Sequence, residues 1–305
     1  MTDAPVFPHF KQLELEDRES ISEMLWAYQP ETSELTFTNL FIWRKHYAVQ
    51  WSLWRDTLLF LCTHADGSLF CLPPVGPSAG MEAVHLLLAW LREEKKQPQP
   101  CIVRADGRLA AELAASPDFI IEPQREHYDY VYATGDLVQL AGRKYHGKKN
   151  HVNKFRSDYN FAYEVLTAGH IEACLQLQDA WCDCNRCSED MNLMGEWEAI
   201  REILGSCDRL SVQGGVIVID GAVEAFTLGE LLNKDTAVVH IEKANARIPG
   251  LYAVMNQQFC EHAWSGTAFV NREQDLGDEG LRQAKLSYHP VRLVEKFKIR
   301  LAEHS

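Results

Sequence analysis

The stretch GGVIVIDGAVEAFTLGELLNKDTAVVHIEKA, residues 214–244, contains three apolar runs separated by two turns. Asp220 and Gly221 separate the first two runs, and Asp–Gly is a favoured two-residue turn between antiparallel strands. Asn–Lys–Asp at 233–235 separates the second run from the third and is also typical of a turn. The stretch therefore predicts a hairpin followed by a third strand at 236–244.

The segments around this stretch predict further helices and strands. We expect helices over 143–156, 169–182, 190–205, 246–264 and 278–286, and strands over 161–167, 267–271 and 291–300. The first half predicts a comparable mixture, with strands over 46–54, 57–63, 68–74, 101–105, 119–123 and 128–133. The sequence therefore predicts an α/β (α+β) protein of two domains, 1–135 and 136–305, each a mixed, mostly antiparallel sheet flanked by helices.

The composition is that of a globular protein. Of 305 residues, 46% are hydrophobic and 24% charged, and the net charge of −13 argues against affinity of the whole surface for nucleic acid or anionic membranes. The best apolar run, HLLLAWL at 85–91, is too short to span a bilayer, and we see no secretory signal at the N-terminus. Nine cysteines spread along the chain predict reduced thiols in a cytoplasmic protein.

One segment has the opposite charge to the chain. RKYHGKKNHVNKFR, residues 143–156, holds six Lys or Arg and no acid, so the rest of the chain carries −19 (−13 less +6). A helix of this composition can hold phosphates, although a solvated face is the commonest fate of a charge run. We expect a contact with tRNA or another phosphate-bearing substrate here, and Lys144, Lys148 and Lys149 are its candidate residues.

Three segments together resemble a known family. GRKYHGKKNHVNKF (142–155), RIPGLYAVMNQ (247–257) and NREQDLGDEGLRQAKLSYHP (271–290) are similar to the C-terminal domain of phosphatidylglycerol lysyltransferase. The resemblance covers essentially the whole chain and implies a bacterial protein of two tandem GNAT-like domains, related by fold to Fem-type aminoacyltransferases. In that fold two central strands splay around the substrate carbonyl, and the order of elements assigns them to 236–244 and 267–271.

The resemblance directs attention to residues beside these strands. A period of two places Val238, His240 and Glu242 on one face, and we expect His240 or Glu242 to take a proton from an attacking amine. The alternative is a hydrogen-bonded pair lining a domain interface. Tyr288 precedes His289 and Pro290, where a helix must stop, and the resemblance implies that it protonates the leaving group.

A dense polar run follows the strand at 267–271. Asn271, Arg272 and Glu273 would line the mouth of the gap, and Lys285 could neutralise a phosphate or carboxylate. These four residues are the candidates for substrate binding. The alternative is a salt-bridge network that holds the two domains together.

The loop before residue 251 is a candidate phosphate site because a helix start presents free N–H groups. The usual acetyl-CoA pattern is Gln/Arg-x-x-Gly-x-Gly/Ala, and here Arg247 and Gly250 match it. Pro249 lacks an N–H group and Tyr252 replaces a small residue, so a tight CoA site is disfavoured. The alternative is an ordinary loop that begins a helix.

These observations favour an acyl- or aminoacyltransferase of the GNAT/Fem type. The donor would be aminoacyl-tRNA, and the acceptor an amine or hydroxyl. The alternatives are an acetyl-CoA-dependent N-acetyltransferase and a non-catalytic tRNA- or nucleotide-binding protein. We expect no metal, because Cys182, Cys184 and Cys187 have no second knuckle, and no cofactor beyond the donor is certain.

Overall fold

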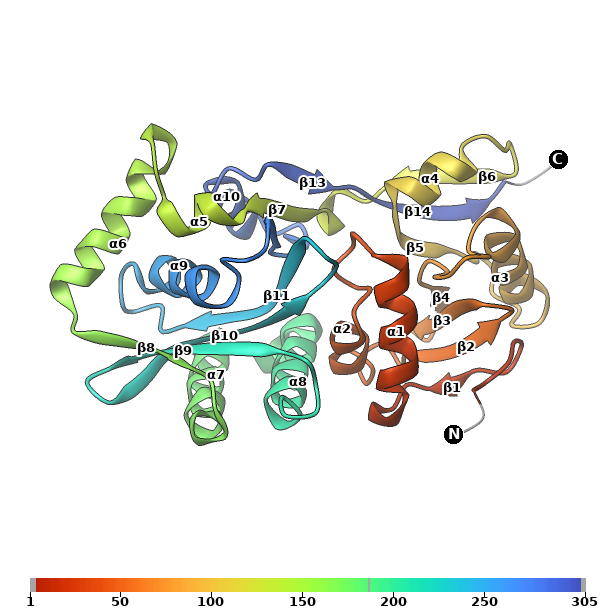
Figure 1. The fold of residues 1–305 in the computed structure, drawn as a ribbon. Coiled ribbons are helices and arrows are strands. Elements are labelled where there is room, and N and C mark those ends of the chain that lie inside the picture. Colours follow the sequence, from red (N-terminus) through yellow and green to blue (C-terminus); the bar gives the residue numbers. More distant parts are fainter. Residues whose placement is uncertain (1–3, 186, 303–305) are drawn as a thin grey trace. The chain divides into compact units, whose positions relative to one another are not determined.

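The computed structural model describes residues 4–185 and 187–302 and divides into two compact units. The first unit contains the chain up to Asp129, Gln274–Gly277 and the segment from Val294 onward. The second unit contains Tyr130–Glu273 and Asp278–Leu293. Each unit is built around its own seven-stranded sheet flanked by helices (Figure 1), so the predicted tandem α/β organisation is confirmed.

The sheet of the first unit is mostly antiparallel. Its strand order is β1 (Lys11–Gln12), β2 (Gln50–Trp54), β3 (Thr57–Thr63), β4 (Leu69–Cys71), β5 (Ile102–Asp106), β14 (Lys296–Leu301), β6 (Phe119–Pro123). Its helices are α1 (Arg18–Tyr28), α2 (Phe37–Ile42), α3 (Met81–Glu93) and α4 (Gly107–Leu113). The buried face of α3 packs on this sheet in one apolar cluster, through Val84, Leu87, Leu88 and Leu91.

The sheet of the second unit contains the three strands predicted over residues 214–244. Its order is β13 (Arg292–Val294), β7 (Asp129–Ala133), β12 (Phe269–Asn271), β11 (Thr236–Ala244), β10 (Ala222–Leu231), β9 (Gln213–Ile219), β8 (Phe161–Val165). Asp220 and Gly221 both have positive φ, 50° and 83°, which a two-residue turn of this type requires. The predicted hairpin and the strand at 236–244 are therefore confirmed.

Helices cover both faces of this second sheet (Figure 1). Helix α9 (Leu251–Ala263) packs on one face through Val254, Met255 and Phe259, against Ile217 and Val239 of the strands. Helices α7 (Ile171–Asn185) and α8 (Met191–Gly205) lie on the other face. The remaining helices are α5 (Thr134–Gln139), α6 (His146–Asp158) and α10 (Glu279–Leu286). Among the described residues, no helix has the length and apolar composition that a membrane span requires.

The two-domain boundaries need correction. The segment 128–133, expected in the first domain, forms β7 and pairs with β12 of the second sheet. The single strand expected at 291–300 is two strands, because β14 pairs with β5 and β6 in the first sheet while β13 belongs to the second. The division 1–135 and 136–305 is therefore replaced by a discontinuous one, set by non-local strand pairing.

The expectation of nine reduced cysteines is also wrong for one pair. Cys182 and Cys187 form a disulfide, while Cys184 between them is a free, exposed thiol. The six other cysteines are free.

Candidate functional site

The strands β11 and β12 run parallel and stop pairing after three residue pairs, the last being Val238 with Asn271. Beyond that point β11 continues over residues 239–244, whereas the chain leaves β12 into Arg272 and Glu273. The two strands predicted to splay are therefore neighbours that separate at this point. Polar side chains from both gather where they part.

A β-bulge in β11 sets the position of His240. Leu228 pairs with Ile241 and the next residue, Gly229, pairs with Val239, so His240 is an extra residue in the ladder. A Cβ atom at Gly229 would lie 2.3 Å from the carbonyl oxygen of Val238, so only glycine fits opposite this bulge. Bulges re-aim side chains, and this one interrupts the period of two that the sequence predicted through Val238, His240 and Glu242.

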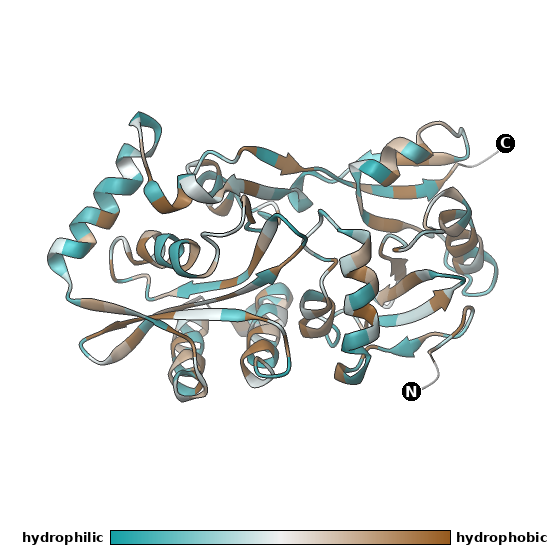
Figure 2. Cartoon of the chain, in the orientation of Figure 1, coloured by the Kyte–Doolittle hydropathy of each residue, from teal (hydrophilic) through white to brown (hydrophobic). Residues whose placement is uncertain are grey.

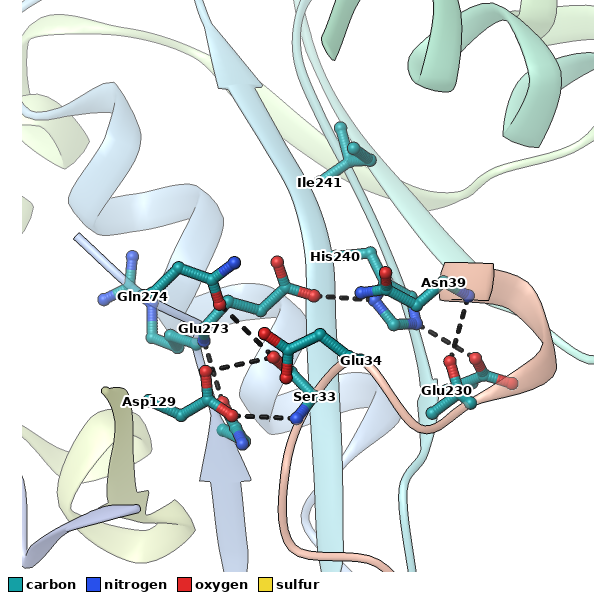
Figure 3. A network of polar contacts seen from close by, with 12 residues as sticks. Ser33, Glu34, Asn39, Asp129, Glu230, His240, Ile241, Glu273 and Gln274 are labelled. Carbon is teal, nitrogen blue, oxygen red and sulfur yellow. Dashed lines mark hydrogen bonds and ion pairs between the residues drawn. The ribbon is translucent and has the colours of Figure 1, made fainter. Parts of the chain in front are cut away.

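His240 lies between two carboxylates (Figure 3). Its Nδ1 lies 2.8 Å from Oε1 of Glu273, and its Nε2 lies 3.0 Å from Oε1 of Glu230. Burial lowers the pKa of His240, but the two carboxylates together outweigh it and raise the pKa to about 9. The imidazole is therefore a cation at neutral pH that donates from both nitrogens.

This arrangement favours a structural role for His240 over the expected role as a base. A general base must be unprotonated at the working pH and have a nitrogen free to accept the proton. Both ring nitrogens of His240 are engaged by carboxylates, and its side chain is only 1% exposed. The geometry therefore supports a structural cation, which ties β10, β11 and the turn after β12 together.

A second cluster surrounds Glu242. Its Oε1 accepts a hydrogen bond from Nη2 of Arg272 at 3.0 Å, and its Oε2 accepts one from Nδ2 of Asn256 on α9 at 3.4 Å. Burial lowers the pKa of Arg272, but Glu242 together with Tyr132, Tyr288 and Cys260 outweighs it and the pKa rises, so the guanidinium stays charged. Among the described residues, Nη1 of Arg272 and Oδ1 of Asn256 have no hydrogen-bond partner although both atoms are buried.

Tyr288 completes this cluster. The guanidinium carbon of Arg272 lies 4.9 Å from the centroid of its ring, and Nζ of Lys148 lies 4.1 Å from the same centroid. Burial raises the pKa of Tyr288 to about 12 while Arg272 opposes the rise, so the hydroxyl is protonated at neutral pH. Burial lowers the pKa of Lys148, and Arg272 lowers it further. The cluster of Glu242, Arg272, Asn256, Tyr288 and Lys148 is called the Arg272 cluster below.

The other three predicted substrate residues shape the turn after β12. Oδ1 of the fully buried Asn271 accepts from the backbone N–H of Glu273, whose φ of 55° is in the left-handed region. Nζ of Lys285, also buried, donates to the carbonyl oxygens of Arg272 and Glu273. These contacts hold the turn that directs Glu273 toward His240. They favour a positioning role for Asn271 and Lys285 over direct substrate binding.

The predicted phosphate residues lie in different environments. Lys144 is exposed but forms an ion pair with Asp136 at 3.0 Å, whereas Lys149 is exposed on α6. Lys148 belongs to the Arg272 cluster instead. Figure 2 shows that α6 is mostly hydrophilic along its length.

The loop before α9 places Arg247 and Gly250 differently. The side chain of Arg247 is exposed. Gly250 has a φ of 86°, and a Cβ there would lie 2.8 Å from the carbonyl oxygen of His151. Close packing of this loop on α6 therefore explains the glycine without a bound phosphate.

Two residues of the two clusters, Glu230 and Asn256, and one neighbour, Tyr132, were not predicted. Glu230 precedes the turn after β10, and Asn256 lies in the middle of an amphipathic helix. The centroid of the Tyr132 ring lies 5.8 Å from the guanidinium carbon of Arg272. A polar residue on the buried face of a helix is the one local signal that indicated Asn256. The positions of Glu230 and Tyr132 near the site follow from strand pairing, which no local sequence signal predicts.

The fold is that of a tandem GNAT-like protein. The chain belongs to the family described as phosphatidylglycerol lysyltransferase, C-terminal, whose model matches residues 27–300. It is similar to a conserved protein of unknown function from Bacteroides thetaiotaomicron, with 34% identity, a TM-score of 0.89, and coverage of 96% of this chain and 99% of that one.

Two further structures share the fold at low identity. L-PGS from Bacillus licheniformis is 13% identical with a TM-score of 0.65, over 95% of this chain and 93% of that one. A tandem GNAT protein from the clavulanic acid biosynthesis pathway is 13% identical with a TM-score of 0.51, over 97% and 99%. An uncharacterised protein from Mycoplasmoides gallisepticum is 20% identical over 174 residues, and this match spans only 57% of this chain and 56% of that protein. Family and fold together support an aminoacyltransferase-like function.

Proposed function

We propose that the chain is an aminoacyltransferase that takes an aminoacyl group from aminoacyl-tRNA and transfers it to an amine or hydroxyl acceptor. One observation carries the proposal. A protonated tyrosine, Tyr288, and a charged, partly buried arginine, Arg272, adjoin at the point where β11 and β12 separate. Acyl transfer requires such groups, a fixed positive charge for the carbonyl oxygen and an acid for the leaving alcohol.

In this proposal the acceptor attacks the ester carbonyl of the donor. The guanidinium of Arg272 stabilises the negative charge that develops on the carbonyl oxygen. Tyr288 gives its proton to the ribose hydroxyl that leaves. Each carboxylate oxygen of Glu242 keeps a second lone pair beside its hydrogen bond, so Glu242 takes the proton released by the acceptor and passes it to solvent, from which Tyr288 recovers its own. No covalent enzyme intermediate is required, so positioning and electrostatics supply the rate.

Helix α6 supports the choice of a polyanionic donor. Lys149, Lys154 and Arg156 are exposed on it, and Lys148 on the same helix reaches the Arg272 cluster. One helix can therefore contact the phosphates of the donor and its acylated end.

The first unit favours no equivalent chemistry. There too a parallel strand pair, β4 with β5, is joined by a single residue pair. The carboxylate of Glu112 accepts from the N–H of Met81 at the start of the following helix, α3. A side chain of the protein itself thus occupies the position where that helix would bind an anion. We therefore assign the chemistry to the second unit.

Equilibrium binding of a mixed aminoacyl-tRNA pool, with and without excess CoA, tests the proposal first. We expect salt-sensitive binding that CoA does not displace, followed by loss of the ester-linked amino acid when acceptor amines are added. Displacement by CoA would instead favour the acetyl-CoA-dependent alternative. Binding without any transfer would favour a non-catalytic tRNA-binding protein.

A further inference from the structure

The Arg272 cluster contains two buried polar atoms whose hydrogen-bonding capacity is unused within the described chain. Oδ1 of Asn256 is an acceptor, and the residue is 1% exposed. Nη1 of Arg272 is a donor whose side chain is 14% exposed. Buried polar groups are nearly always satisfied in folded proteins, so a pair of unused ones indicates a bound group.

The contacts with Glu242 determine which of the two atoms accepts a hydrogen bond and which donates one. Because its Oε2 is a carboxylate oxygen, the amide of Asn256 must turn its NH2 group toward it, which leaves Oδ1 as the free atom. Its Oε1 accepts from Nη2 of Arg272, and the guanidinium cannot lose a proton, so Nη1 can only donate. The matching ligand offers one N–H or O–H donor and one oxygen acceptor.

We propose that Asn256 and Arg272 recognise the donor's acyl group as an α-amino acyl group. Oδ1 of Asn256 accepts a hydrogen bond from the α-amino group, and Nη1 of Arg272 donates to the acyl carbonyl oxygen. The inference rests on the proposed function and adds to it a residue that selects the substrate. An acetyl group offers the carbonyl oxygen but no α-amino group, so it leaves Asn256 unsatisfied.

The chemistry of the cluster favours an amino group over a second acceptor. Oδ1 of Asn256 cannot donate, so a carboxylate or phosphate oxygen placed there would meet only repulsion from it. The Arg272 and Lys148 cations favour a neutral amine, whose N–H still donates to the amide oxygen. Asn256 therefore distinguishes an acyl group that has an α-amino group from one that lacks it.

Two stable probes test this inference by equilibrium binding. One is 3′-aminoacylamino-3′-deoxyadenosine, an amide that imitates the acylated end of tRNA. The other carries the same acyl group without its α-amino group. We expect the native protein to bind the first probe about 10- to 100-fold more tightly, as loss of one hydrogen bond to a buried group implies.

The matched variants are Asn256→Leu and Gln258→Leu on the same helix. Gln258 is also buried, but its amide donates to Glu261 at 3.0 Å, outside the Arg272 cluster. Asn256→Leu should remove the preference between the probes, whereas Gln258→Leu should keep it. A preference that survives in Asn256→Leu would overturn the assignment of Asn256.

The native protein alone separates the remaining outcomes, so the test does not depend on the folding of a variant. Equal affinity for the two probes would refute recognition of the α-amino group and leave the proposed transfer intact. Binding of neither probe, combined with no transfer from aminoacyl-tRNA, would overturn the proposed function and this inference with it.

Discussion

Gly229 on β10 lies opposite the bulge at which β11 inserts His240. Because Gly229 has no side chain, the carbonyl oxygen of Val238 can approach the backbone of β10. The bulge in turn directs the imidazole between Glu230 and Glu273. A backbone contact and a buried charge network therefore depend on one residue.

We expect Gly229→Ala to destabilise the protein by roughly 2–4 kcal/mol, because the added methyl group meets fixed backbone atoms. A urea titration would measure this. Gly147→Ala in α6 is the control, since a Cβ there meets nothing within 4 Å and should stabilise the helix by about 0.5–1 kcal/mol. Equal effects of the two substitutions would contradict the role of Gly229.

The pH dependence of stability should report His240. Its pKa is raised from 6.5 to about 9 in the folded state, so the stabilisation is complete below pH 6.5 and is lost as the pH rises to about 9. The shift corresponds to about 3 kcal/mol. The free energy of unfolding measured between pH 6 and 10 should fall accordingly.

His240→Gln should remove this pH dependence between 6.5 and 9. His9→Gln, at an exposed position of the first unit, should leave it intact. A native-like slope in His240→Gln would show that another group titrates.

In the first unit, Nζ of Lys296 lies 2.6 Å from both Glu34 and Asp129 and is completely buried (Figure 3 shows the two acids). Lys296→Met leaves two buried carboxylates without their cation, and we expect a loss of roughly 3–5 kcal/mol in stability. Lys298→Met, two residues along β14 at a partly exposed position, should cost less than about 1 kcal/mol. Thermal unfolding of both variants would distinguish them.

If Tyr288 is the acid of the proposed transfer, Tyr288→Phe should lower kcat by about 100-fold with little change in KM. Tyr132→Phe is the control, because the Tyr132 hydroxyl donates to the carbonyl oxygen of Lys285 and lies outside the proposed chemistry. A loss confined to KM would instead assign Tyr288 to binding.

Helix α6 should contribute to tRNA affinity through charge alone. Reversing Lys149 and Lys154 to Glu should reduce the slope of log affinity against log salt by roughly 1.5–2. Lys96→Glu in the first unit is the control, since it is exposed and distant in sequence from the basic segment. An unchanged slope in the α6 variant would show that α6 is only a solvated face.

The sequence predicted those elements whose signals are local. The turn at Asp220 and Gly221 and the strand at 236–244 were found because turn chemistry and apolar periodicity are read within a few residues. The assignment of β11 and β12 as the two strands that separate followed from the family resemblance.

Other features depend on pairing between distant segments. The period of two through His240 assumed an unbroken ladder, and the bulge that breaks it is visible only in the register with β10. Lys285 was assigned to a substrate because its partners, the carbonyl oxygens of Arg272 and Glu273, are backbone atoms that no side-chain pattern reveals. The placement of β14 between β5 and β6 was likewise beyond local signals.

That placement of β14 has a consequence for biosynthesis. Proteins emerge from the ribosome N-terminus first, yet the first sheet lacks the strand between β5 and β6 until residues 296–301 have been made. Strands β5 and β6 lack β14, the strand that pairs with both of them, while the whole second unit is synthesised. The N-terminal half of a nascent chain should therefore stay sensitive to proteases and bind chaperones until translation ends. A truncated chain released after residue 135 would not fold into the native first unit.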